Sequence, residues 1–400
     1  MTHVIVVGGG PVGTVAALDA ARSGFDVTIV EAATEVQDDP RASTLHPPTL
    51  EMLDDLGLLD EVLRLGLTAR YFDFWDKPNR SLVARLDHEV LRDETRFPFV
   101  VQTEQHKIAR LGLDRLEALP NVDVRLGTRV TGVEQSAGTA TVHAEGPGGP
   151  VDLAGDWVIG CDGARSTVRK SMDIEFEGYT WDERFVVLTT LFDFAEAMDC
   201  SYRAYFADPV EWSNLFKVAG DDLKGRWRVV FPARPGESDE EALSDESVRR
   251  RMEAVWPGAS AGEVVHGKLY RVHQRVAQKF RVGRVLLSGD AAHVNNPIGG
   301  LGLNCGIHDA VELMEALRAH EGGASTDVLD AYETRRRDLN IRYVQEQTVG
   351  NKRRLEETDP ELRAQRLDEL REIAADEESQ RRFLRRTSLL ESVREPHVTG

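Results

Sequence analysis

Hydrophobic residues near the start of the chain form two short continuous runs with a helical pattern between them. The runs, Val4–Val7 and Val27–Val30, are typical of buried parallel strands. The segment from Val12 to Ser23 is rich in Ala and Leu, as expected of a helix that packs on such strands. This order predicts a βαβ unit at the start of the chain.

The pattern changes along the rest of the chain. Short strands separated by glycine-rich turns fill residues 122–159, and strand-like segments with aromatic and β-branched residues occupy about 173–275. A buried strand returns at Arg284–Ser288, and long helices are expected from Leu303 and from Thr326. After Lys352 the chain is rich in Arg and Glu, which indicates solvated helices packed on the body or on a second subunit.

These elements predict a mixed α/β (α+β) fold in three parts. A discontinuous Rossmann-like domain is expected over residues 1–172 and 276–345. Residues 173–275 are expected to form a sheet domain that covers the substrate, and residues 346–400 a C-terminal helical tail.

A glycine motif lies between the first predicted strand and helix. Gly8 permits the tight turn, Gly10 lets the backbone approach a pyrophosphate, and Gly13 lets the helix pack close to the strand. Glu31 follows the second strand, about 18 residues beyond Gly13, where an acid accepts hydrogen bonds from an adenosine ribose. The alternative is a glycine turn of structural use only, and the motif does not separate FAD from NAD.

The composition of the chain limits the kinds of molecule that it is expected to bind. The net charge of −19 disfavours nucleic acid and anionic membranes, because either would require a basic face. No apolar run approaches the ~20 residues of a membrane span, and the first strand begins too early for a signal peptide. Cys161, Cys200 and Cys305 have neither metal-ligand spacing nor a disulfide framework. We therefore expect no metal site and a cytoplasmic location.

Two further motifs complete a recognisable set. Cys161-Asp162-Gly163 stands in the middle of the chain, and Gly289-Asp290-Ala291-Ala292-His293 leads into a glycine-rich segment that ends at Asn304. With Gly8–Gly13 and Glu31, these motifs resemble the class A flavoprotein aromatic hydroxylases, the p-hydroxybenzoate hydroxylase-like FAD-dependent monooxygenases. The resemblance covers residues 1 to about 345.

The resemblance assigns roles to residues at matching positions. Asp290 is implied to bind the FAD ribityl chain, and Asp162 with Gly163 to touch the pyrophosphate and the arriving nicotinamide nucleotide. The backbone N–H groups of Leu303 and Asn304 are implied to face the flavin N1 edge. The other implied residues are Arg41 and Gln102 as FAD contacts, Gly300 and Gly302 against the flavin ring, and Pro297 on its substrate side.

The implied reaction is hydroxylation of a small phenolic or heteroaromatic substrate. NAD(P)H would reduce FAD, and O2 would give a flavin C4a-hydroperoxide that transfers one oxygen atom. We favour His46 as the base near the ring hydroxyl, with His273, Tyr202 and Tyr270 as alternatives. The acidic residues Glu35, Asp38 and Asp39 favour NADH over NADPH through repulsion of the 2′-phosphate.

Several points stay open. Tyr205, Trp212, Phe216, Trp227 and Phe231 are candidates for an aromatic pocket. Surface exposure is expected for Arg203, Arg226 and Arg228, with pairing to a substrate carboxylate as the alternative. His293 is expected to be a packed histidine without a chemical role. Other functions on this fold are a flavin-dependent reductase, epoxidase or halogenase, or a non-catalytic redox-sensing nucleotide-binding module. The enzyme is expected to be a monomer or homodimer.

Overall fold

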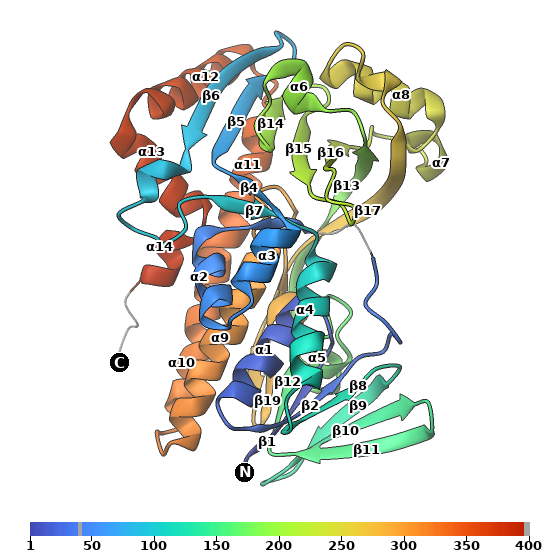
Figure 1. Cartoon of the computed structure of the whole chain (residues 1–400), viewed down its shortest axis with the longest axis vertical. Coiled ribbons are helices and arrows are strands. Elements are labelled where there is room, and N and C mark those ends of the chain that lie inside the picture. The colour runs from blue at the N-terminus through green and yellow to red at the C-terminus, as the bar shows by residue number, and fades with distance from the viewer. Residues whose placement is uncertain (39–41, 396–400) are drawn as a thin grey trace.

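The computed structural model describes residues 1–38 and 42–395 and contains two large sheets (Figure 1). The first is six-stranded, in the order β18-β19-β12-β1-β2-β8, and its strands are parallel except β18 (Arg281–Val282). The glycine turn joins β1 (His3–Val7) to α1 (Pro11–Arg22), and β2 (Asp26–Val30) follows. The predicted βαβ unit is therefore confirmed. The remaining strands are β8 (Val122–Arg125), β12 (Trp157–Gly160) and β19 (Val285–Leu287).

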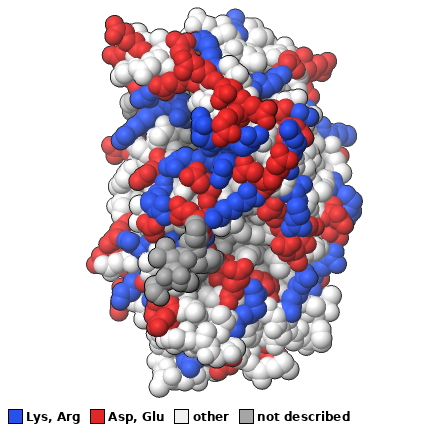
Figure 2. Space-filling model, turned by 90° about the vertical axis from the view of Figure 1, so that its left-hand side faces the viewer, with Lys and Arg blue, Asp and Glu red and all other residues white. Residues whose placement is uncertain are grey.

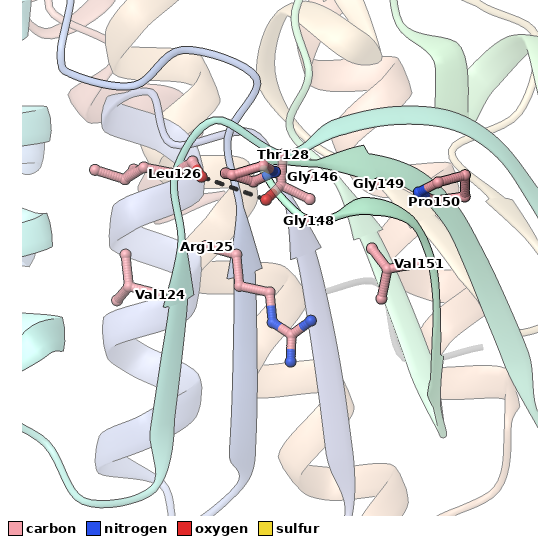
Figure 3. A pocket seen from close by; sticks show the side chains of 10 residues that line it. Val124, Arg125, Leu126, Thr128, Gly146, Gly148, Gly149, Pro150 and Val151 are labelled. Atoms are coloured by element: carbon pink, nitrogen blue, oxygen red, sulfur yellow. Dashed lines mark hydrogen bonds between the residues drawn. The ribbon is translucent and has the colours of Figure 1, made fainter.

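The predicted short strands before β12 form an antiparallel meander at one end of this sheet. It consists of β9 (Arg129–Gln135), β10 (Ala140–Gly146) and β11 (Gly149–Gly155). A hollow of about 390 Å³ lies between β8 and the turn from β10 to β11 (Figure 3). The described residues that line it include none of the expected site residues, so we assign it no role.

The second sheet has eight strands in the order β20-β17-β13-β16-β15-β14-β5-β6. Residues 173–275 supply its middle, from β13 (Phe176–Thr190) through β14 (Arg203–Ala207), β15 (Ser213–Val218) and β16 (Arg226–Pro232) to β17 (Val264–Ala277). The expected range was too narrow for this sheet, because β5 (Tyr71–Asp76), β6 (Ser81–Asp87) and β20 (His293–Val294) join it from elsewhere. Hydrogen bonds between β14 and β5, which are far apart in the sequence, add β5 and β6 to the edge of this sheet.

The two faces of this sheet separate the aromatic residues that the sequence left unassigned. Tyr205, Trp212 and Phe216 pack with Phe72 on one face. On the other face, Trp227 and Phe231 pack beneath α6 (Phe194–Met198), α7 (Asp239–Ala242) and α8 (Asp245–Val255). Only the first group shares a hydrophobic cluster with Ile298 of the glycine-rich segment among the described residues.

Helices complete both layers. Against the first sheet lie α4 (Gln105–Glu117), α9 (Gly302–Glu321) and α10 (Asp327–Leu339). A π-helical turn, Asn340–Gln345, continues into α11 (Glu346–Leu355), followed by α12 (Pro360–Ala375), α13 (Glu377–Thr387) and α14 (Leu390–Arg394). No helix among the described residues combines the length and apolar character that a membrane span requires.

The C-terminal helices pack on the body of the same chain. Leu367 and Leu370 of α12 enter the apolar cluster of the second sheet, and Arg363 donates to Asp76 at 2.6 Å. Acidic and basic side chains alternate over the face shown in Figure 2. This agrees with the predicted solvated helices.

Candidate functional site

The glycine turn after β1 leaves one open position. A Cβ on Gly8, whose φ is +112°, would lie 2.4 Å from the Cys161 carbonyl oxygen, and one on Gly13 would lie 1.9 Å from the Gly8 carbonyl oxygen. Both positions therefore require glycine. A Cβ on Gly10 would meet no described atom within 4 Å. The geometry fits the predicted approach of a pyrophosphate at Gly10, at the N-terminus of α1.

Glu31 lies beside this turn. Its Oε2 accepts a hydrogen bond from the Gly9 N–H at 2.7 Å, and its Oε1 accepts one from the Ala33 N–H at 2.8 Å. The carboxylate is thereby fixed at the carboxyl end of β2. Its contact with a ribose stays a prediction.

Asp162 caps a helix. Its carboxylate accepts hydrogen bonds from the N–H groups of Thr167 at 2.6 Å and Val168 at 3.1 Å, at the start of α5 (Thr167–Ser171). Burial raises the pKa of Asp162, against the effect of these hydrogen bonds. Gly163 has φ +77°, and a Cβ there would meet no described atom within 4 Å. Asp162 thus holds the loop while Gly163 leaves room beside it.

The third motif forms a short turn, Gly289–Ala291, directly after β19. Asp290 is exposed on this turn. His293 is fully buried and lies 2.6 Å from Asp309 of α9, so the expectation of a packed histidine missed an ion pair. The partner was not evident because it stands on a different element.

Gln102 of β7 (Val100–Gln102) offers an unused donor. Its Oε1 accepts a hydrogen bond from the Thr44 hydroxyl at 2.9 Å, whereas its buried Nε2 has no hydrogen-bond partner in the described structure. A buried amide donor without a partner is costly unless a ligand accepts from it. Gln102 therefore fits the predicted FAD contact. Arg41 lies outside the described residues.

The Asn304 side chain is fully used within the protein. Its Oδ1 accepts from the His46 N–H at 2.8 Å and the Thr49 hydroxyl at 2.7 Å. Its Nδ2 donates to the carbonyl oxygens of Thr44 at 2.8 Å and Gly300 at 2.7 Å. Only the backbone of Asn304 is thus left for a cofactor, and its contact with the flavin stays a prediction.

The glycine-rich segment leads into the N-terminus of α9. Gly300 has φ +67°, and its N–H donates to the Pro297 carbonyl oxygen at 3.0 Å. The N–H groups of Gly302, Leu303 and Asn304 stand in the first turn, where helix geometry provides no carbonyl partner. Pro297 is exposed. These amides could bind an anionic group, since the helix dipole is positive at this end.

Adjacent parallel strands bring the three motifs together. The chain after β1, β12 and β19 emerges at one edge of the first sheet, because these strands are parallel neighbours. Open space at Gly10 and Gly163, the Gln102 amide and the α9 N-terminus all fit a dinucleotide with a ring system. This is the crevice where such sheets bind nucleotides.

Beside this crevice lies what we call the buried polar cluster: His46, His88, Arg203 and Tyr205. Arg203 Nη2 donates to the Gly299 carbonyl oxygen at 3.1 Å, and His46 Nε2 lies 3.2 Å from the same oxygen. Several buried polar atoms of the cluster have no hydrogen-bond partner in the described structure: His46 Nδ1, His88 Nε2, Arg203 Nε and Nη1, and the Tyr205 hydroxyl.

Two residues of the cluster were not predicted correctly from the sequence: the burial of Arg203 was not expected, and His88 was not identified as a candidate. Arg203 was expected at the surface but is 1 % exposed, with its guanidinium 4.0 Å from the centre of the Phe72 ring. Alternation along β14 puts Arg203 and Tyr205 on one face, but the sequence did not indicate which face is covered. Of the other candidate bases, Tyr270 is half-buried and His273 lies 2.9 Å from the Thr180 hydroxyl.

Burial keeps the histidines of the cluster neutral. Burial, and then the charge of Arg203, hold the pKa of His46 well below its usual value. The same two causes lower the pKa of His88 to about 4. Burial also lowers the pKa of Arg203 and raises that of Tyr205. The charge of the cluster at neutral pH therefore resides on Arg203.

Comparison with known proteins agrees with this arrangement. The family described as "FAD binding domain" matches residues 1–347. A para-nitrophenol 4-monooxygenase from a Pseudomonas strain is 38 % identical over 390 residues, which cover 95 % of this chain and 94 % of that protein. A 6-hydroxy-3-succinoylpyridine 3-monooxygenase from Pseudomonas putida is 37 % identical over 359 residues, 88 % of each chain.

A solved structure shows the same fold. The p-nitrophenol 4-monooxygenase PnpA from Pseudomonas putida aligns with a TM-score of 0.91 at 35 % identity, over 99 % of this chain and 100 % of that one. The family match over residues 1–347 includes all three motifs and all strands of the second sheet. The chain therefore belongs to the class A flavoprotein aromatic hydroxylases and is an FAD-dependent aromatic monooxygenase.

Proposed function

We propose that this enzyme hydroxylates a small phenol or hydroxylated heteroaromatic ring bound at the buried polar cluster, using NADH and O2. The observation that carries the proposal is Arg203, a buried cation to which the described residues supply no carboxylate within salt-bridge distance. A buried charge without a counter-ion is costly, and an anionic ligand oxygen would offset that cost. A phenolate is such a ligand.

The cluster also offers an apolar wall and neutral acceptors. The Phe72 and Tyr205 rings are 4.8 Å apart and nearly perpendicular, an arrangement suited to contact with a third aromatic ring. His46 is neutral, so with its proton on Nε2 towards Gly299 its Nδ1 can accept a hydrogen bond from a ring hydroxyl. In this proposal Arg203 stabilises the oxygen anion and His46 accepts the proton.

When bound, FAD supplies the electron transfer and oxygen activation. Residues of this chain would hold it through the Gly8–Gly13 turn, Glu31, Asp162 and Gly163, Gln102, Asp290 and the α9 N-terminus. Pro297 is exposed shortly before that N-terminus, and we infer that it lies on the substrate side of the flavin. We further infer NADH as the reductant, because Glu35 and Asp38 are exposed in the loop after Glu31 and repel a 2′-phosphate. Three free thiols suit a cytoplasmic enzyme.

The relatives support a hydroxylated ring as substrate. One is named for para-nitrophenol and another for 6-hydroxy-3-succinoylpyridine, and both substrates carry a ring hydroxyl and an electron-withdrawing substituent. We propose the same class here. This chemistry matches a site whose cation can stabilise an ionised hydroxyl.

Anaerobic reduction of the flavin tests this proposal. The holoenzyme is mixed with NADH or NADPH, with and without nitrophenols, hydroxybenzoates and hydroxypyridines, and loss of the oxidised flavin absorbance is timed. We expect NADH to reduce faster than NADPH and a phenol to accelerate reduction. Equal rates with every compound would contradict the proposed substrate class, and faster reduction by NADPH would contradict the choice of reductant.

A further inference from the structure

The carboxylate of Asp309 lies fully buried behind the turn that carries Asp290. Its Oδ2 accepts a hydrogen bond from the Gly289 N–H at 3.1 Å and lies 2.6 Å from His293 Nε2. Its Oδ1 accepts a hydrogen bond from Arg336 Nε, on α10, at 2.7 Å. One side chain of α9 thus connects both ends of the Gly289–Ala291 turn to a second helix.

The buried group is charged. Burial by itself disfavours the imidazolium, but the Asp309 carboxylate outweighs burial and raises the pKa of His293 to about 10. Burial also disfavours the carboxylate, yet His293 and Arg336 lower the pKa of Asp309 to about 2. The His293–Asp309 pair is therefore ionised throughout the neutral range. Glu312 lies 3.5 Å from Arg336 Nη1 and 2.9 Å from Arg335 Nε, so two arginines share this second carboxylate.

Two other side chains hold carbonyl oxygens of the turn and of the strand before it. Arg169 Nη1 donates to the Ala291 oxygen at 2.8 Å, and the Tyr332 hydroxyl donates to the Leu287 oxygen at 2.8 Å. Tyr332 restrains the strand before the turn, whereas Asp309 restrains the residues on either side of Asp290. Removing Asp309 would also leave His293 facing Arg336 without the anion between them.

We propose that Asp309 is a positioning residue for FAD, which fixes the turn that presents Asp290 to the cofactor by holding Gly289 and His293. This assignment does not depend on the aromatic substrate. Nor does it depend on turnover, because its effect is on the affinity of the apoprotein for FAD.

The test measures the FAD dissociation constant between pH 6 and pH 9 by quenching of flavin fluorescence. For the parent enzyme we expect a constant independent of pH. Asp309→Asn should bind FAD about 10- to 100-fold more weakly, the range for one hydrogen bond to a charged group. The loss should be the same from pH 6 to pH 9, because His293, buried beside Arg336 without the carboxylate, stays neutral over this range.

Tyr332→Phe is the matched control, since it removes a buried hydrogen bond beside the same turn without removing charge. It should lower the stability of the apoprotein and leave FAD affinity near that of the parent. Parent-like affinity of Asp309→Asn, or a loss no greater than that of Tyr332→Phe, would overturn the proposal. If Asp309→Asn does not fold, His293→Gln is measured in its place. If His293→Gln then binds FAD no more weakly than Tyr332→Phe does, the proposal is equally overturned.

Discussion

Arg203 and Arg226 stand on the same sheet, and burial gives them different roles. Arg226 lies 3.3 Å from Asp222 near the surface, whereas Arg203 is buried against Phe72 and faces Gly299. In the sequence both are arginines on short aromatic strands. Which strand face is covered depends on the glycine-rich segment some hundred residues later, so local pattern could not separate them.

Replacing Arg203 tests its role in binding the anionic substrate. Arg203→Gln should weaken binding of 4-nitrophenol about 10- to 100-fold, because one charge-assisted hydrogen bond is lost. FAD should stay bound. Binding of 4-nitroanisole, the methyl ether that cannot ionise, should be weakened much less than binding of 4-nitrophenol. Perturbation of the flavin absorbance measures both affinities. Arg226→Gln is the control, and equal losses for both ligands would argue against recognition of charge.

His46 has a pKa well below its usual value, which determines how kcat is expected to depend on pH. The imidazole is therefore neutral near neutral pH, and its own titration should not appear in the kcat profile there. His46→Gln should lower kcat roughly 10²-fold, as expected on loss of a proton acceptor, without shifting that profile. Steady-state rates from pH 6 to pH 9 measure this. His273→Gln should resemble the parent, and a parent-like rate for His46→Gln would remove His46 from the mechanism.

At the scale of the elements, the glycines in the turn from β1 into α1 serve two purposes. One is needed for folding and another leaves room for the cofactor. Gly13 is packed against the Gly8 carbonyl, but the Gly10 position is open within the protein. The spacing of these glycines allowed their roles to be predicted from sequence, because strand, turn and helix are contiguous. The contact of Gly8 with Cys161 was not predictable, since it depends on the pairing of β1 with β12.

Two alanine substitutions distinguish these roles. Gly10→Ala should leave the apoprotein near parent stability and weaken FAD binding, because the new methyl group enters only the space for the pyrophosphate. Gly13→Ala should destabilise the apoprotein itself by several kcal/mol, about the cost of overpacking a closed contact. Urea unfolding of the apoprotein and FAD titration measure the two effects. Equal destabilisation by both substitutions would mean that Gly10 is not at an open site.

The packing of α9 on α2 (Pro47–Asp55) should weaken in acid. His308 lies 2.9 Å from the Thr49 hydroxyl, and burial, then the charge of Arg336, lower its pKa to about 3. Below pH 6.5 the unfolded chain binds a proton that the folded chain excludes, so the free energy of unfolding falls with pH until about 3. The loss is at most about 1.4 kcal/mol per pH unit for this group.

Urea unfolding between pH 6 and pH 4 checks this prediction. His308→Gln should reduce the slope of unfolding free energy against pH, whereas His266→Gln, at an exposed site, should not. Identical slopes for His308→Gln and the parent would show that His308 is protonated in the folded enzyme.

For the whole molecule, the sequence predicted the six-stranded sheet and its motifs better than the eight-stranded sheet. Contiguous motifs predicted the turn after β1, Glu31 and the α9 N-terminus, and the structure brings them to one edge. The second sheet was only partly foreseen, because β5 and β6 reach it through long-range pairing. His88 and the His293–Asp309 pair were missed for the same reason: their partners stand on other elements.

Incorporation of labelled oxygen tests aromatic hydroxylation most directly. The holoenzyme is supplied with NADH, ¹⁸O₂ and each phenol or hydroxypyridine of the panel in turn, and the organic products are analysed by mass spectrometry. We predict that one labelled oxygen atom enters the ring of an accepted compound in the parent enzyme and in Arg226→Gln, with much less product from Arg203→Gln. Consumption of NADH without a labelled product, across the panel of phenols and hydroxypyridines, would contradict aromatic hydroxylation at this site.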